Sequence, residues 1–209
     1  MAKDLPIAKL LAELGYRTDA AQAAARGALE DAGITRAGKE RIAAWKRDDA
    51  EAVLQARVAL LCPACVEAGL GRDVTDPVVA GTGDRCRVCE GSANRRGSIA
   101  FADACERAGL ERVIVVGGSP DIRRELPQLL GDRLDLRVVD GTVARPGRDV
   151  QREVDGADLV VLLGSTELNH TVSATWAGPK TVATQTRGIG AFLLEAAAKV
   201  ADRAGRAGR

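Results

Sequence analysis

The sequence predicts an α/β protein with three parts: an N-terminal helical module, a cysteine-rich segment and a small C-terminal domain with a doubly wound parallel sheet. Apolar residues recur at helical spacing up to about residue 60, and two pairs of cysteines follow. From about residue 98, short apolar β-branched runs alternate with helical segments. These three patterns divide the 209 residues into parts of ordinary domain size.

The helical module is expected to span residues 1–60. Apolar side chains at helical spacing predict a first helix in residues 4–16, and a second helix is expected to end at Gly33. A third helix is expected to begin at Thr35 and to run through Trp45, and a fourth to cover residues 48–61.

The junction between the second and third helices, "ALEDAGITRAGKERI", is similar to a helix-turn-helix. The expected third helix is basic, and one interpretation is a nucleic-acid-binding face that includes Arg36, Lys39 and Arg41. The other interpretation is the solvated face of a plain helical bundle.

The C-terminal domain is expected to span residues 98–203, with a helix that begins at Ser98. Strands that are apolar along their whole length are buried on both faces, as in a parallel sheet covered by helices. Right-handed crossovers then favour the strand order 2-1-3-4. A disordered basic tail is expected at residues 204–209. The predicted strands are residues 112–116, 134–139, 158–163 and 180–184.

The four paired cysteines have the spacing C-x2-C-x20-C-x2-C, which is typical of a tetrahedral zinc site. We expect a zinc ribbon at residues 61–97, because the segment has too few large apolar residues to fold without a metal. Four thiolates leave no open coordination position, so the predicted zinc is structural. The fifth cysteine, Cys105, is expected in the core. The predicted ligands are Cys62, Cys65, Cys86 and Cys89.

Basic residues surround the second cysteine pair. Arg85 precedes the pair, Arg87 lies between its two cysteines, and Arg95 and Arg96 follow it. Such a rim suits the phosphates of DNA or RNA, but it also suits a docking surface for a protein partner or a second copy of the chain. The residue pattern leaves both alternatives open.

Ligands of doubly wound sheets bind beyond the carboxyl ends of the strands, where the strand order reverses. Two glycine-containing loops are expected there, together with an arginine that follows the last strand. They suit an anionic small molecule or a nucleotide, although the same residues occur in ordinary turns and helix N-caps. The candidates are Gly117, Gly118, Ser119, Gly164, Ser165, Thr166, Asn169, His170 and Arg187.

Composition limits the function classes. The formal charge of +1 provides no overall attraction to nucleic acid or membranes, so any basic surface must be local. Aromatic residues make up only 2% of the chain, which excludes a platform of stacked rings for nucleic acid. No apolar run approaches the roughly 20 residues of a membrane span, and no signal peptide is recognised. We therefore expect a cytoplasmic protein.

About 80 residues, from "RVIVVGGSP" to "RGIGAFLLEAA", resemble a bacterial family called domain of unknown function 2325. The shared features are a strand that ends in Gly117-Gly118, a strand that ends in Asp140-Gly141, an "H-x-V-S" helix start at His170, and "R-G-I" from Arg187 to Ile189. The resemblance implies a small Rossmann-like fold and no known activity.

The sequence thus favours a noncatalytic protein that binds nucleic acid or a macromolecular partner, with an α/β domain for ligand sensing or assembly. The alternative is an enzyme that acts on a nucleotide or phosphoester at the carboxyl ends of the strands. The absence of an evident acid–base pair in the sequence favours binding.

Overall fold

The computed structural model describes residues 4–72, 78–79, 83–164 and 170–207. The chain divides into two compact units, Met1–Ser92 and Ala93–Arg209, which are described separately. In the part of the chain that the structure describes, no helix combines the length and the apolar character that crossing a membrane would require.

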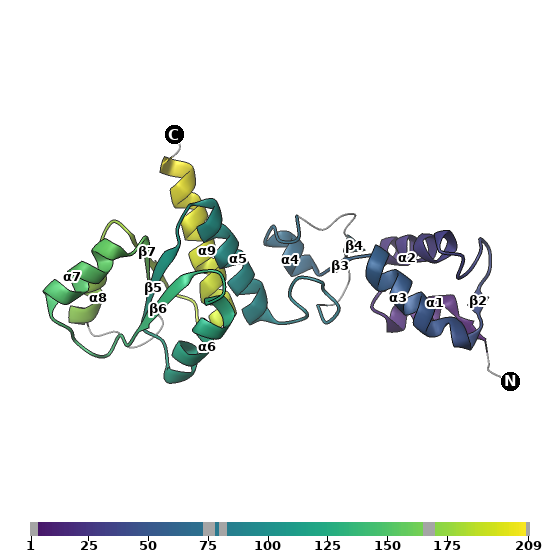
Figure 1. The fold of residues 1–209 in the computed structure, drawn as a ribbon, viewed down its shortest axis with the longest axis horizontal. Coiled ribbons are helices and arrows are strands. Elements are labelled where there is room, and N and C mark those ends of the chain that lie inside the picture. Colours follow the sequence, from purple (N-terminus) through teal and green to yellow (C-terminus); the bar gives the residue numbers. More distant parts are fainter. Residues whose placement is uncertain (1–3, 73–77, 80–82, 165–169, 208–209) are drawn as a thin grey trace. The chain divides into compact units, whose positions relative to one another are not determined.

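In its described residues, the first unit contains short helices and five elements of two or three residues (Figure 1). Strand β1 pairs antiparallel with β2, and β3 pairs parallel with β4. Its elements are β1 (Leu5–Pro6), α1 (Ile7–Glu13), α2 (Asp19–Asp31), β2 (Arg41–Ile42), the 3-10 helix η1 (Ala44–Lys46), α3 (Arg47–Arg57), β3 (Leu60–Leu61), α4 (Pro63–Glu67) and β4 (Val78–Val79).

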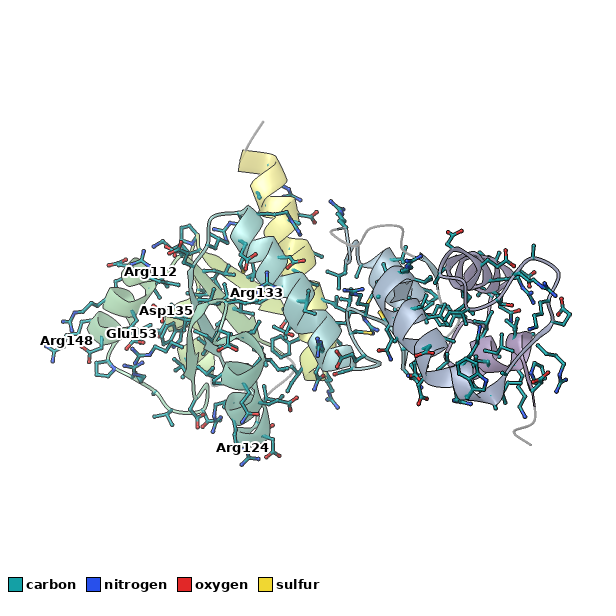
Figure 2. All side chains as sticks on the ribbon, turned by 45° about the vertical axis from the view of Figure 1, so that its right-hand side comes forward. Arg112, Arg124, Arg133, Asp135, Arg148 and Glu153 are labelled. Atoms are coloured by element: carbon teal, nitrogen blue, oxygen red, sulfur yellow. The ribbon has the colours of Figure 1, made fainter. Side chains whose placement is uncertain are left out.

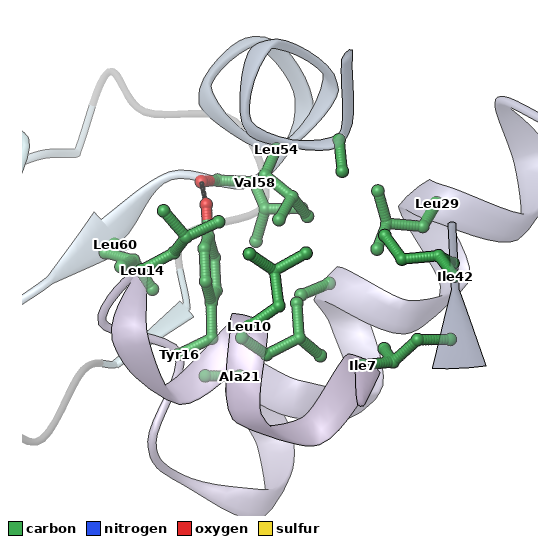
Figure 3. Packing of buried hydrophobic residues seen from close by; sticks show 13 residues of the cluster. Ile7, Leu10, Leu14, Tyr16, Ala21, Leu29, Ile42, Leu54, Val58 and Leu60 are labelled. Atoms are coloured by element: carbon green, nitrogen blue, oxygen red, sulfur yellow. Dashed lines mark hydrogen bonds between the residues drawn. The ribbon is translucent and has the colours of Figure 1, made fainter. Parts of the chain in front are cut away.

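The core of this unit forms where α1, α2 and α3 turn their apolar faces toward one another (Figure 3). Leu10, Leu29 and Leu54 are almost completely buried there. The Tyr16 hydroxyl donates a hydrogen bond of 3.3 Å to the Val58 carbonyl, which ties the end of α1 to the end of α3. This core fixes the start of the cysteine-rich segment, because β3 continues directly from it.

The third helix predicted from Thr35 through Trp45 is wrong. Gly38 has a φ of 74°, a left-handed conformation that interrupts a helix, and β2 pairs with β1 immediately afterwards. Trp45 lies in η1 and is 70% exposed. The basic residues Arg36, Lys39 and Arg41 therefore lie on a turn and a short strand rather than on one helix face.

The second unit contains a four-stranded parallel sheet with the order β6-β5-β7-β8, which confirms the predicted fold class and the order 2-1-3-4. Its elements are α5 (Ala93–Arg107), β5 (Arg112–Val116), α6 (Pro120–Leu130), β6 (Asp135–Val139), α7 (Gly147–Gly156), β7 (Leu159–Leu163), α8 (His170–Trp176), β8 (Thr181–Thr184) and α9 (Ile189–Ala207).

The helices cover both faces of this sheet. Because the chain moves from β5 to β6 in one direction and then back across to β7, right-handed crossovers place α6 and α7 on opposite faces. Helices α7 and α8 contact each other on one face, and α5 contacts both α6 and α9 on the other (Figure 1). The first of these layers buries Val150 and Trp176 against β5 and β7.

Two predicted boundaries in this unit are wrong. Helix α5 begins at Ala93 rather than at Ser98, whose buried hydroxyl donates to the Arg95 carbonyl within the helix. The tail expected to be disordered is helical as far as Ala207. Alanine and arginine are good helix formers, and they extend α9 in spite of Gly205.

Helices α5 and α9 approach each other through two glycines. A Cβ atom added to Gly97 would lie 2.4 Å from the Gly190 carbonyl oxygen, and one added to Gly190 would lie 2.3 Å from the Ala93 oxygen. Asn94 closes the same contact: its Oδ1 accepts from the Gly190 N–H at 3.0 Å, and its Nδ2 donates to Glu125 at 2.7 Å. The backbones can approach this closely only because neither glycine has a side chain.

We predict that Gly97→Ala destabilises the second unit by about 1–3 kcal/mol or more, since backbone atoms must move to admit the methyl group. The control is Gly205→Ala, which introduces the same methyl group in α9 with no atom within 4 Å. Denaturant unfolding can be followed by fluorescence of Trp176, which is 1% exposed. Equal midpoints for the two variants would contradict the prediction.

Candidate metal centre

The four paired cysteines converge on one point in the first unit. Their sulfur atoms all lie within 4.8 Å of one another, and all four residues are buried. The Sγ atoms of Cys62 and Cys89 are 3.7 Å apart, and two thiolates at about 2.3 Å from a tetrahedral ion are roughly 3.8 Å apart. The donor set and its spacing therefore fit a tetrahedral metal ion.

Each cysteine pair lies on a tight backbone turn. In the first turn, the Cys65 and Val66 N–H groups donate to the Cys62 carbonyl at 3.0 and 3.2 Å, and Pro63 begins α4. In the second, the Glu90 N–H donates to the Cys86 carbonyl at 2.9 Å. These turns direct both thiols of a pair to the same side.

The second turn requires a left-handed backbone. Glu90 has a φ of 50° and is the only non-glycine residue with a positive φ in the described part of the chain, and Gly91 follows with a φ of 81°. A non-glycine residue in this conformation is uncommon. The turn that presents Cys86 and Cys89 is therefore held in place by its surroundings.

The environment of the thiols affects their protonation. Burial raises the pKa of Cys65 and of Cys89. Burial also acts to raise the pKa of Cys86, but hydrogen bonds from the backbones of Cys89, Cys62 and Val88 outweigh it and lower that pKa to about 7. Backbone donors aimed at a thiolate are typical of ligand turns, where they stabilise the anion that a metal binds.

The fifth cysteine, Cys105, lies elsewhere. It is fully buried in α5 of the second unit, as predicted for a core residue, and burial raises its pKa to about 12. It therefore provides a natural comparison for the four clustered thiols.

The second cysteine turn also presents arginines to solvent. Arg85 and Arg87 are exposed, and the Arg87 N–H donates to the Leu60 carbonyl at 2.8 Å, which fixes this turn against β3. Beside the first turn, Arg72 is exposed and its guanidinium passes close to Gly69. Within the described residues, none of these three guanidinium groups has an ion-pair or hydrogen-bond partner.

The other predicted basic residues lie on other elements of the chain. Arg41 donates to the Asp4 carbonyl, and the Lys39 carbonyl accepts from Arg26 at 3.0 Å, so both positions are involved in closing the turn before β2. Arg36 is exposed. Arg95 and Arg96 lie in the first turns of α5, in the second unit.

At the rim of the parallel sheet, the predicted ligand-binding residues have structural contacts of their own. The Ser119 hydroxyl caps α6 by accepting from the Ile122 N–H at 3.4 Å. Gly117 and Gly118 have φ values of 102° and 89°, and a Cβ on Gly118 would lie 2.9 Å from Ile122. A Cβ on Gly164 would lie 2.8 Å from the Thr184 carbonyl oxygen. A ligand role for these residues stays a prediction.

Part of the predicted rim cannot be compared with the structure. Ser165, Thr166 and Asn169 lie outside the described residues, and His170 begins α8 without a described side chain. Arg187 is exposed, with no ion-pair partner among the residues that the structure describes.

Sequence reasoning named the glycine loop at this rim but missed Arg123. A space of about 430 Å³ lies beyond the ends of β5 and β6, lined by the Gly117–Pro120 loop, Arg123 and the Asp140–Thr142 turn. Arg123 donates to the Gly118 carbonyl at 2.7 Å and pairs with Asp140 at 2.9 Å. Arg123 stands one helical turn after the glycine loop, a position that could have indicated its orientation.

The loop that carries Arg187 is anchored by Glu195 of α9. One carboxylate oxygen accepts from the Gln185 N–H at 2.9 Å and from the Thr186 N–H and hydroxyl at 3.0 and 2.9 Å. The other accepts from Lys199 at 2.8 Å. Burial acts to raise the Glu195 pKa, but these hydrogen bonds outweigh it and lower the pKa to about 2.

No family model, curated protein or solved structure matches the chain. The resemblance to domain of unknown function 2325 therefore stays a prediction.

We predict that Glu195 stabilises the second unit in a pH-dependent way. Its folded pKa of about 2 is below the ordinary value of 4.5, so its contribution is fully present above about pH 4.5 and is lost as the pH falls toward 2. Glu195→Gln should therefore reduce the loss of stability over this range.

The control is Glu111→Gln, an exposed residue of the same unit whose carboxylate accepts no hydrogen bond from a described residue. Chemical unfolding at a series of pH values between 2 and 6 measures both variants. An unchanged pH profile for Glu195→Gln would show that the anchor contributes nothing to stability.

Proposed function

We propose that the protein is a noncatalytic zinc protein whose first unit binds the phosphates of nucleic acid through arginines beside the metal centre. The observation that carries the proposal is the position of Arg72, Arg85 and Arg87 next to the cysteine turns, exposed and with no carboxylate partner among the residues that the structure describes. Guanidinium groups that are free of acidic partners suit phosphate, which they can bind with two parallel hydrogen bonds.

Zinc is the metal that this donor set favours. Four thiolates in tetrahedral arrangement select zinc or iron in preference to harder ions that prefer oxygen. When bound, zinc would stabilise the fold and catalyse no reaction, because four cysteine ligands would occupy all of its coordination positions. These ligands are Cys62, Cys65, Cys86 and Cys89. The cysteine turns would then hold the backbones of Arg85 and Arg87 at fixed positions.

The second unit has a supporting place in this proposal. Its parallel sheet and the cavity beside Arg123 suit ligand sensing or assembly, including assembly with a second copy of the chain. Arg187 provides a further exposed cation at the same end of the sheet.

We predict one zinc ion per chain, lost in Cys86→Ser and retained in Cys105→Ala. Loss of one thiolate removes a ligand and should destabilise the segment between the cysteine pairs, since structural zinc in small fingers provides about 10–16 kcal/mol. Elemental analysis of the purified full-length proteins measures the stoichiometry. Iron in place of zinc, or full metal content in Cys86→Ser, would contradict the assignment.

We predict that the double variant Arg85→Glu, Arg87→Glu weakens binding to a fluorescent 20-base-pair duplex by at least about tenfold. Each lost phosphate contact also reduces the slope of log K against log salt by about 0.9, so the slope should fall by about 2. Fluorescence anisotropy at several salt concentrations measures both quantities.

The matched control is Arg148→Glu, Arg152→Glu, which makes the same charge change on α7 of the second unit, where Arg148 projects from the helix (Figure 2). This control should bind like the unmodified protein, and both variants should retain their zinc. If both double variants bind the duplex equally well, the arginines beside the metal centre do not contact phosphate. That surface would then be better explained as a site for a protein partner.

A further inference from the structure

A small cavity lies beside the same arginines within the first unit. It has a volume of about 210 Å³, is open to solvent on one side, and is bordered by the end of α1, the second half of α3, and the segment from Val58 to Leu60. Drug-sized ligands occupy sites of about 300–1,000 Å³. This cavity therefore suits one ring system rather than a larger molecule.

The walls of the cavity are apolar on one side and polar on the other. Leu14, Leu54, Val58 and Leu60 provide the apolar side, and they belong to the rigid core of the unit (Figure 3). Figure 3 shows the Tyr16 ring between these groups, with its hydroxyl committed as a donor to Val58. The flat faces of a ring would contact apolar side chains here.

The polar side offers hydrogen-bond acceptors. Glu51 and Gln55 both line the cavity, and the Gln55 amide donates to one Glu51 oxygen at 3.3 Å. This contact leaves the second Glu51 oxygen and the Gln55 carbonyl oxygen as acceptors. A ring that carries an exocyclic amino group would satisfy them.

Arg85 and Arg87 line the same cavity. The Arg85 side chain extends over Gly15, where an added Cβ would lie 2.8 Å from its Cγ atom. Glu51 belongs to the same lining, so the carboxylate and the cations border one space. A ligand in the cavity thus has an anion-binding group and an acceptor pair within reach.

We infer that this cavity binds one nucleotide unit, with an unstacked, amino-bearing base against the apolar wall that includes Tyr16 and its phosphate on Arg85 and Arg87. Enzymes and receptors that bind an extruded base read its edge by hydrogen bonds and hold its faces between apolar or aromatic side chains. The inference deepens the proposed function and rests on its phosphate contacts. It adds a preference for single strands, and for cytosine over thymine, which lacks the exocyclic amino group.

The experiment compares four probes on the full-length zinc-loaded protein: a dC 12-mer, a dT 12-mer, a 12-base-pair duplex, and the mononucleotide CMP. We expect the dC strand to bind at least about fivefold more tightly than the dT strand and the duplex, since a well-placed base contact provides about 1–3 kcal/mol of discrimination. If CMP binds as tightly as the dC strand, the natural ligand of the cavity is a free nucleotide rather than a strand.

Two variants of α3 test whether the base binds in the cavity. Gln55→Phe puts a ring at the exposed rim and should reduce binding of the dC strand and of CMP at least tenfold. Ala56→Phe introduces the same ring on an exposed position of α3 outside the cavity and should bind as the unmodified protein does.

The outcomes separate the inference from the proposed function. Equal affinity for the dC strand, the dT strand and the duplex, all reduced by Arg85→Glu, Arg87→Glu, would overturn the base site and leave the phosphate surface standing. A preference for dC that Gln55→Phe does not reduce would also overturn it. Failure of every probe to bind would overturn both proposals together.

Discussion

The cysteine-rich part of the first unit depends on bringing four buried sulfur atoms together. Contacts between buried thiols contribute little stability. Burial also raises the pKa of Cys65 and of Cys89, which disfavours their ionisation. A bound metal reverses this balance, because it binds the thiolate and compensates the charge. The segment between Cys65 and Cys86 supplies few large apolar side chains, so the cluster takes the place of a hydrophobic core there.

The second unit depends on a different constraint, which is the packing of helices on both faces of a buried sheet. The strands β5 and β7 are apolar along almost their whole length, and they require helices on each side. On one side, α5 and α9 meet at Gly97 and Gly190 without intervening side chains. Asn94 then provides the hydrogen bonds that a helix end in this packed position would otherwise lack.

These two constraints explain which features the sequence could predict. Spacing alone located the metal cluster, since the two C-x-x-C turns dictate local geometry, and wholly apolar strands located the parallel sheet and its order. The helix expected from Thr35 failed because its helical periodicity competed with pairing between β1 and β2, a contact between distant parts of the chain. The predicted start of α5 was wrong because Ser98 resembles an N-cap, whereas its hydroxyl donates to Arg95 within a helix that already begins at Ala93. The cavity on α3 depends on tertiary packing and has no local signal.

The metal centre and the cavity on α3 are connected by the backbone of the second cysteine turn. Arg87 lies between Cys86 and Cys89, and its N–H donates to Leu60, a residue of both the hydrophobic core and the cavity wall. Arg85 immediately precedes Cys86 and packs on Gly15 at the end of α1. Positions of these arginines therefore depend on both the core and the metal ligands. For the proposed phosphate binding this has a physical advantage, because arginines whose backbones are already fixed need less ordering when they meet an anion.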